Sequence, residues 1–166
     1  IGFVAGHMTF AQYKKIKELN KKIKFIPTLG IIESLRQIKG PEELTRIKKA
    51  VDITVKAFGF AKKIISAGRR EIEAAGELER FIRYNGAYAS SFDIIVASGP
   101  NSASPHYLTG QRKIKNNEPV LVDLGIDYQG YKSDLTRVFF LGKISPIVRK
   151  TYDIVLRAQA QAIRTI

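Results

Sequence analysis

The spacing of apolar residues changes its period once along the chain, and this change separates a helical stretch from a β-rich stretch. Between residues 40 and 86 apolar positions recur with the repeat of an amphipathic helix. One helix is expected to begin at Pro41 and to stop before Gly68, because proline suits the first helical turn and glycine suits helix ends. A second helix should begin at about Arg70. The residues predicted to face inward are Leu44, Ile47, Val51, Val55, Phe58, Ala61 and Ile65 in the first helix, and Ile72, Ala75, Leu78 and Ile82 in the second.

Beyond these helices the pattern favours strands. The run from Phe92 to Ser98 is rich in residues typical of strands, and the glycine, prolines and serines of residues 99–105 predict a loop. Two further runs, Pro119–Ile126 and Tyr131–Leu141, predict strands joined by a tight turn. Ser145 and the proline after it indicate the start of a last helix.

The first 39 residues carry a pattern of their own. A short strand, a helix capped by Thr9, a second short strand and a short helix follow one another, as at the end of a β-α-β unit. From residue 40 onward two helices precede the strands without strand–helix alternation, which predicts an α+β fold rather than a doubly wound sheet. We therefore expect two domains, residues 1–39 and residues 40–166.

The composition narrows the classes of partner. The net charge of +13 would suit nucleic acid, but the lysines are dispersed and no alternation of aromatic and basic residues marks a base-stacking surface. We therefore expect no nucleic-acid partner. The absence of cysteine excludes disulfides and thiolate chemistry and is compatible with the cytoplasm, the location we expect. No apolar run approaches the roughly 20 residues that span a bilayer, so no membrane partner is expected.

Two aspartates stand on the two predicted strands of the hairpin. If the turn falls at residues 128–129, Asp123 lies directly opposite Asp134, with Cβ atoms roughly 4.5–5.5 Å apart. Opposed carboxylates repel each other, and their apolar neighbours would raise the cost of ionisation by burying them. A shared proton, a cation such as Lys132 or Arg137, or a bound divalent ion would offset the repulsion. Two surface aspartates facing solvent are the alternative.

Two other candidate sites need separate treatment. The segment Gly125–Ser133 has the composition of a phosphate-binding P-loop, but Tyr131 separates Gly130 from Lys132 and a β run follows instead of a helix. A P-loop is therefore excluded. His106 lies in the predicted loop, where a lone histidine is by itself more typical of a surface residue than of a catalyst.

Several motifs in this chain, taken in order, resemble the Xaa-Pro peptidases, which are prolidase and Xaa-Pro aminopeptidase of the methionine aminopeptidase-like pita-bread superfamily. Asp123 and Asp134 stand eleven residues apart, as the first two metal ligands of that family do. The motifs are Ser-Phe-Asp-Ile-Ile-Val-Ala-Ser-Gly-Pro-Asn-Ser-Ala at residues 91–103, Pro-His at 105–106, Val-Asp-Leu-Gly at 122–125 and Gly-Tyr-Lys-Ser-Asp-Leu-Thr-Arg at 130–137.

The resemblance implies a fold and a domain plan. Residues 40–166 would be the first half of a pita-bread (creatinase/aminopeptidase) catalytic domain. Residues 1–39 would be the C-terminal remnant of the smaller α/β domain that precedes it in creatinases and prolidases, with a linker at residues 31–36. The full-length protein would be a homodimer acting on proline-containing peptides.

The resemblance also implies roles for three residues. Asp123 would serve one divalent ion and Asp134 would bridge two, the ions being manganese, cobalt or zinc. Such ions activate water and polarise the peptide carbonyl before proline. His106 corresponds to the family histidine that hydrogen-bonds the substrate and stabilises the tetrahedral intermediate.

Two departures from the family pattern shape the expectation. Family members complete the metal site with one histidine and two glutamates further along the chain, and this sequence ends at Ile166 before those positions. We therefore expect a piece truncated at both ends and inactive alone. Lys132 stands where smaller or neutral residues are usual. The alternative to a peptidase is an inactive pita-bread binding module, which the basic charge favours and the two aspartates oppose. Dipeptidase and aminopeptidase are not distinguished.

Overall fold

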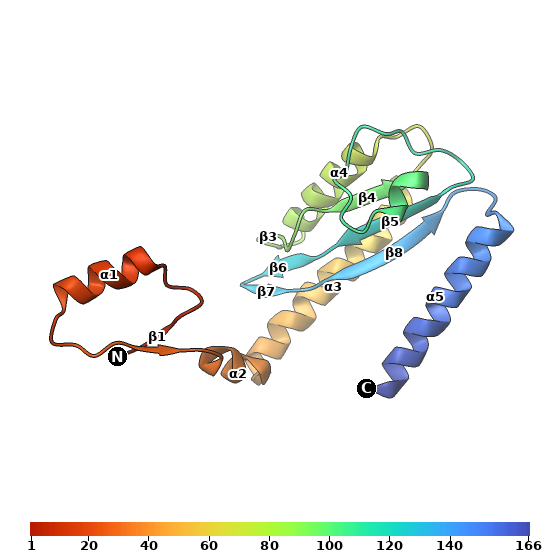
Figure 1. Cartoon of the computed structure of the whole chain (residues 1–166). Coiled ribbons are helices and arrows are strands. Elements are labelled where there is room, and N and C mark those ends of the chain that lie inside the picture. The colour runs from red at the N-terminus through yellow and green to blue at the C-terminus, as the bar shows by residue number, and fades with distance from the viewer. The chain divides into compact units, whose positions relative to one another are not determined.

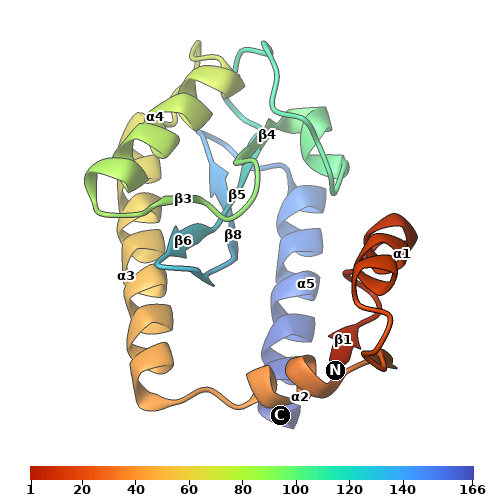
Figure 2. The ribbon, with the colours of Figure 1, turned by 90° about the vertical axis from the view of Figure 1, so that its left-hand side faces the viewer.

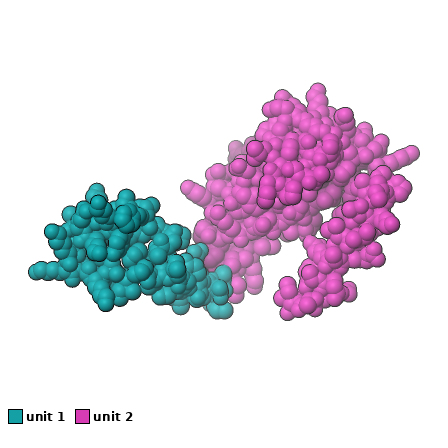
Figure 3. Space-filling view, viewed as in Figure 1, with its two compact units in different colours: residues 1–41 teal, residues 42–166 magenta.

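The computed structural model describes residues 1–166, and Figures 1 and 2 show the chain from two sides. The chain divides into two compact units, residues 1–41 and residues 42–166 (Figure 3). None of the helices combines the length and the apolar character that crossing a bilayer requires.

The N-terminal unit is a small β-α-β arrangement followed by a short helix (Figure 1). Its elements are β1 (Gly2–Val4), α1 (Phe10–Leu19), β2 (Ile26–Thr28) and α2 (Ile31–Gln37). The two strands are parallel neighbours. The predicted cap of α1 is confirmed, because the Thr9 side chain accepts from the Gln12 N–H while the Gln12 side chain accepts from the Thr9 N–H.

The second unit has the predicted α+β character. Its elements are α3 (Pro41–Ile64), α4 (Glu71–Tyr84), β3 (Ala89–Ser90), β4 (Ile95–Ser98), the 3-10 turn η1 (Gly99–Ala103), β5 (Pro119–Leu124), β6 (Ile126–Tyr128), β7 (Tyr131–Lys132), β8 (Leu135–Phe140) and α5 (Pro146–Thr165). The strands form two antiparallel sheets, in the orders β3-β6-β7 and β4-β5-β8. Helices α3 and α4 lie on one side of the strands and α5 on the other (Figure 2).

The core of this unit lies between the strands and helices α3 and α4. Along β5 the side chains of Val120, Val122 and Leu124 are buried and alternate with less buried residues, including Asp123. This is the pattern of a strand with one face on a core. Asp123 is consequently placed on the opposite face of the strand, away from the core.

The buried face of α3 differs from the predicted one. Three residues predicted to face inward, Leu44, Val51 and Val55, are exposed. The predicted Phe58, Ala61 and Ile65 are buried, and so are Ala50, Ile53, Thr54 and Ala57, which the pattern did not predict. The pattern of large apolar residues found this face only in part, because three of the six buried residues of α3 are alanines. On α4 the predicted Ala75, Leu78 and Ile82 are buried, and Ile72 is exposed.

The hairpin turns one residue later than the sequence predicts. Gln129 and Gly130 both have positive φ, 53° and 83°, which is the combination of a two-residue type I′ turn. The Asp127 side chain accepts a hydrogen bond of 2.9 Å from the Gly130 N–H and closes this turn. Tyr128 therefore pairs with Tyr131.

This turn corrects the predicted pairing of the aspartates. Asp123 lies opposite Thr136, not opposite Asp134. When the turn shifts by one residue, the residue that lies opposite a given position shifts by two, here from Asp134 to Thr136. Since side chains alternate with a period of two, the displacement leaves both aspartates on the same face of the hairpin.

Both predicted hairpin strands are interrupted at one level. A Cβ atom at Gly125 would lie 2.0 Å from the Ser91 Oγ and 2.1 Å from the Ser133 carbonyl oxygen. Only glycine therefore fits where three chain segments meet. Here β5 gives way to β6, and β7 ends before β8 begins.

The predicted strand from Phe92 is shorter than expected and begins at Ile95. Ser90 pairs with Ile126, and Ile95 pairs with Asp123. Four residues, 91–94, therefore lie opposite only two, Leu124 and Gly125. Residues 91–94 cannot all pair with them, and the strand is interrupted here. This irregular segment separates the two sheets and, as described below, lines the candidate site.

We expect Gly125→Ala to lower the free energy of unfolding by about 3 kcal/mol, because the added methyl would overlap backbone and buried side-chain atoms. Gly59→Ala is the matched control. Gly59 lies inside α3 with open space around its Cβ position, so alanine should raise stability by about 0.5–1 kcal/mol. Chemical unfolding of both variants measures the difference, and equal stabilities would contradict the close approach at Gly125.

Candidate metal centre

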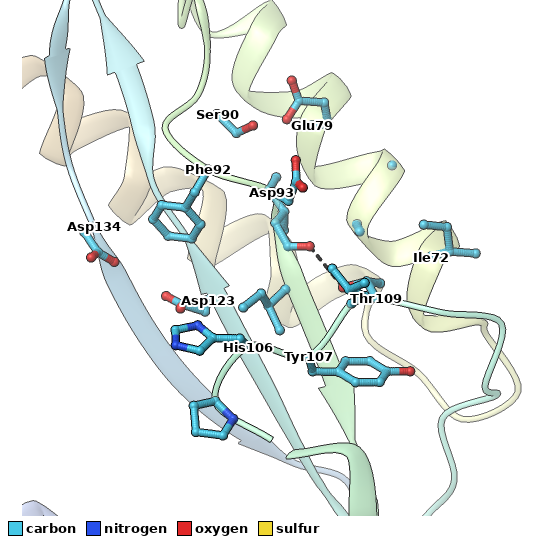
Figure 4. A pocket seen from close by; sticks show the side chains of 16 residues that line it. Ile72, Glu79, Ser90, Phe92, Asp93, His106, Tyr107, Thr109, Asp123 and Asp134 are labelled. Carbon is cyan, nitrogen blue, oxygen red and sulfur yellow. Dashed lines mark hydrogen bonds between the residues drawn. The ribbon is translucent and has the colours of Figure 1, made fainter. Parts of the chain in front are cut away.

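A cleft of about 860 Å³ brings together the three residues that the sequence singled out (Figure 4). Asp123 enters it from β5 and Asp134 from the break between β7 and β8, while His106 comes from the loop after η1. Helix α4 and the irregular segment 91–94 form the opposite wall. Residues distant in the sequence thus project into one space.

The two aspartates differ in their surroundings. Asp123 is half-buried, and its Oδ1 accepts a hydrogen bond of 2.8 Å from the Thr136 hydroxyl. Asp134 is exposed. The expectation that apolar neighbours bury both carboxylates is wrong, since those neighbours point to the other face of the strands.

The two predicted cationic partners do not pair with the aspartates. The Lys132 ammonium is exposed and lies 3.4 Å from the Ser91 carbonyl oxygen. The Arg137 guanidinium donates to the Thr136 carbonyl oxygen. The repulsion between the two carboxylates is instead weakened by solvent, since Asp134 is exposed and Asp123 is only half-buried. It is also weakened by distance, because Asp134 lies two residues along the strand from Thr136, the residue directly opposite Asp123.

Ser133, the residue before Asp134, is held in place by a chain of hydrogen bonds that leads to helix α3. The Ile126 N–H donates to the Ser133 Oγ (3.0 Å), which lies 2.6 Å from the Thr54 hydroxyl, which donates to the Ala50 carbonyl oxygen (2.9 Å). Either hydroxyl can donate to the other, and the Ser133 hydroxyl also lies 3.4 Å from the Ala50 carbonyl oxygen. Helix α3 thereby anchors the backbone that carries Asp134.

The loop that carries His106 is attached to the edge of β4. The Thr109 hydroxyl accepts from the Val96 N–H (2.9 Å) and donates to the Ile94 carbonyl oxygen (3.0 Å), replacing a neighbouring strand with one side chain. His106 itself is exposed, and its imidazole projects into the same part of the cleft as Asp123 (Figure 4).

A residue that the sequence did not single out, Glu71, is fully buried at the start of α4. Its Oε1 accepts from the Ser98 N–H and hydroxyl, both at 2.7 Å, and its Oε2 accepts from the Tyr107 hydroxyl at 2.7 Å. The Asn101 amide lies 3.1 and 3.2 Å from the two oxygens. No sequence pattern indicated this network, because an acid at a helix start is ordinarily explained by the helix dipole.

An ion pair between Arg112 and Glu118 extends this network. Arg112 donates to both Glu118 oxygens, at 2.7 and 2.8 Å, and also to the Ser98 hydroxyl at 2.5 Å. The hydrogen bonds from Arg112 hold the pKa of Glu118 below its ordinary value. Burial, followed by the hydrogen bond to Glu71, raises the pKa of Tyr107, so this hydroxyl stays a donor.

The donor set fits part of a divalent-cation site. Carboxylate oxygens and imidazole are ligands that manganese, cobalt and zinc accept, and Asp123 and Asp134 present such oxygens to one cleft. No group of three or more His, Cys, Asp or Glu side chains is close enough together to hold an ion alone. These residues alone would therefore offer fewer ligands than a stable site needs.

The fold and this partial site agree with comparisons to known proteins. Residues 45–166 match the model of metallopeptidase family M24. The match covers most of the chain, and the chain belongs to this family.

Several of the relatives are named as Xaa-Pro dipeptidases or X-Pro aminopeptidases. The chain is 36% identical over 160 residues to the Xaa-Pro dipeptidase of Pyrococcus furiosus, covering 96% of this chain and 46% of that protein. The structure superposes on an Xaa-Pro dipeptidase from Bacillus anthracis with TM-score 0.92 and 42% identity, covering 96% of this chain and 44% of that one. For the X-Pro aminopeptidase of Thermotoga maritima the TM-score is 0.93 and the identity 32%, covering 99% and 47%.

These comparisons confirm the resemblance to the Xaa-Pro peptidases. They also show that the chain spans about half the length of the relatives it matches.

We expect Glu118→Gln to lower the free energy of unfolding at neutral pH by about 2 kcal/mol, because Arg112 loses a charged partner. The folded pKa of Glu118 lies below its ordinary value of 4.5, so its stabilisation is complete above that value and is lost as the pH falls through the folded pKa. The gap between variant and parent should therefore narrow in acid.

Unfolding by urea at a series of pH values measures this gap. The control is Glu77→Gln, which removes an exposed contact with Arg80 and should change stability little at any pH. A gap for Glu118→Gln that stays constant from neutral pH into acid would argue against the ion pair.

Proposed function

We propose that this protein is a metal-dependent peptidase that hydrolyses Xaa-Pro peptide bonds, as a prolidase or an Xaa-Pro aminopeptidase. The observation that carries the proposal is the meeting of Asp123, Asp134 and His106 in one cleft, in a chain of family M24. The named relatives, Xaa-Pro dipeptidases and an X-Pro aminopeptidase, support the choice of substrate.

In this proposal each of the three residues has one task. Asp123 and Asp134 would hold divalent cations. Such cations supply Lewis acidity and activated water. Asp123 is oriented by the Thr136 hydroxyl, and Asp134 by the anchored backbone at Ser133. His106 hydrogen-bonds the substrate and stabilises the charge that develops on the carbonyl oxygen before proline.

The domain plan is part of the proposal. We assign residues 40–166 to the first half of a pita-bread catalytic domain and residues 1–39 to the end of a preceding domain. The separation of the chain into two compact units near Pro41, and the family match from residue 45, support this plan. A homodimer and a cytoplasmic location stay predictions.

The competing function is a pita-bread module that binds a partner without catalysis. The net charge of +13 favours it, because a basic surface attracts acidic partners. The two aspartates oppose it, since a protein that had lost its metals would not need both in one cleft. Metal content and peptidase activity of the full-length protein distinguish the two functions.

In the full-length protein we expect Asp134→Asn to abolish cleavage of Xaa-Pro substrates and to reduce the bound metal, because an amide is a poor bridge between two cations. We expect His106→Ala to keep the metal and to lower kcat by about 10²–10³, since one stabilising donor is lost. Steady-state kinetics and elemental analysis measure both effects. Full activity and metal content in Asp134→Asn, or full rate in His106→Ala, would overturn the corresponding assignment.

We expect the isolated chain of residues 1–166 to bind manganese weakly and to release no proline from Gly-Pro. Its cleft is lined by the carboxylates of Glu79, Asp93, Asp123 and Asp134, but no three potential ligands lie close enough together to hold an ion, so a dinuclear site is incomplete. Isothermal titration with Mn²⁺ and a proline-release assay provide the measurement. Tight binding of two ions per chain, or measurable turnover, would show that the ligand set is larger than described.

A further inference from the structure

We propose that Glu71 is a positioning residue that holds His106 at the cleft. Its buried carboxylate ties together the two ends of the segment that carries His106. The proposal rests on the function proposed above for His106, and it adds a residue that lies outside the metal centre and acts through the loop.

The first argument is the placement of the anchors. Ser98 and Asn101 contact the carboxylate from the N-terminal side of His106, and Tyr107 contacts it from the C-terminal side. One side chain thus closes the loop on both sides of the histidine. Tyr107 is the immediate neighbour of His106, so its position fixes the backbone from which the imidazole projects.

The second argument is the direction of the two neighbouring side chains. His106 points toward the aspartates, whereas the ring of Tyr107 points away from them (Figure 4). The Tyr107 hydroxyl reaches Glu71 at 2.7 Å. The loop is therefore held on its buried side by Glu71 and presents the exposed imidazole on its other side.

The third argument is the rigidity of the carboxylate itself. The Glu71 N–H donates to the Arg112 carbonyl oxygen (2.9 Å), and the Ile72 N–H donates to the Gly110 carbonyl oxygen (3.0 Å). These contacts satisfy two free N–H groups at the start of α4 with the far end of the same loop. Glu71 is consequently fixed by its backbone and its side chain to one loop, and cannot move independently of it.

The fourth argument is the cost of burial. A fully buried carboxylate loses its hydration, and only well-placed donors offset this loss. An apolar side chain of similar size could fill this site without such a requirement. A polar network that satisfies its members specifies one arrangement of a loop more strictly than apolar packing does. Such strictness suits a loop that must place a histidine to within a fraction of an ångström.

The test uses three variants of the full-length protein. Glu71→Gln keeps the size of the side chain but turns one acceptor into a donor that faces other donors. Tyr107→Phe removes a single contact and keeps the ring, so it covers the case in which Glu71→Gln folds poorly. Glu77→Gln is the matched control on the same helix, with an exposed carboxylate outside the cleft.

The first readout needs no activity. In protein labelled at the histidine ring carbons, the NMR signal that disappears in His106→Ala belongs to His106. We expect this signal to shift or broaden in Glu71→Gln and in Tyr107→Phe, and to stay unchanged in Glu77→Gln. An unchanged His106 signal in both Glu71→Gln and Tyr107→Phe would overturn the proposal.

The second readout is a double-mutant cycle on kcat. We expect Glu71→Gln to lower kcat by about 10–100-fold with the metal content unchanged, and to have no further effect when His106 is already alanine. An equal loss with and without the imidazole would mean a general structural role, and would overturn the proposal. If the parent protein cleaves no Xaa-Pro peptide, the proposed function fails, and the NMR readout still decides the role of Glu71.

Discussion

The close approach of three chain segments at Gly125 is the constraint on which the second unit, residues 42–166, depends. The backbone there lies against Ser91 and Ser133, and no side chain could occupy the space. This contact breaks both strands of the hairpin at the same level, so that one continuous hairpin contributes to two sheets. The breaks turn Asp134 into the cleft, and the irregular segment after Ser91 forms the facing wall.

Around Gly125, the residues that hold the backbone in place differ from the residues whose side chains enter the cleft. Ser133, Thr54 and Glu71 are buried and hydrogen-bonded, and each holds a stretch of backbone. Asp134 and His106 are exposed side chains on that backbone. A polar group whose hydrogen bonds are already made within the protein has few left to make with a ligand. The division therefore leaves the ligand-binding atoms free while fixing where they stand.

How much of this could be read from the sequence depends on how local each feature is. The cap of α1 and the start of α3 at Pro41 follow from neighbouring residues and were predictable. The buried face of α3 was predictable only in part, because Ala50 and Ala57 are small residues that do not stand out in a pattern of large apolar positions. The predicted turn of the hairpin was wrong by one residue, but the prediction that Asp123 and Asp134 lie on the same face of the hairpin was right. Any such slip in the turn changes the partners in steps of two.

Glu71 marks the limit of inference from a single sequence. Its partners Ser98, Asn101 and Tyr107 lie 27, 30 and 36 residues away along the chain. No local rule connects a glutamate at a helix start to them, and each of the four residues has an ordinary explanation where it stands. Their meeting is created by the packing of α4 beside β4, which itself depends on the core beneath both. The candidate site residues could thus be found by motif, whereas the contacts of Glu71 emerge only from the fold.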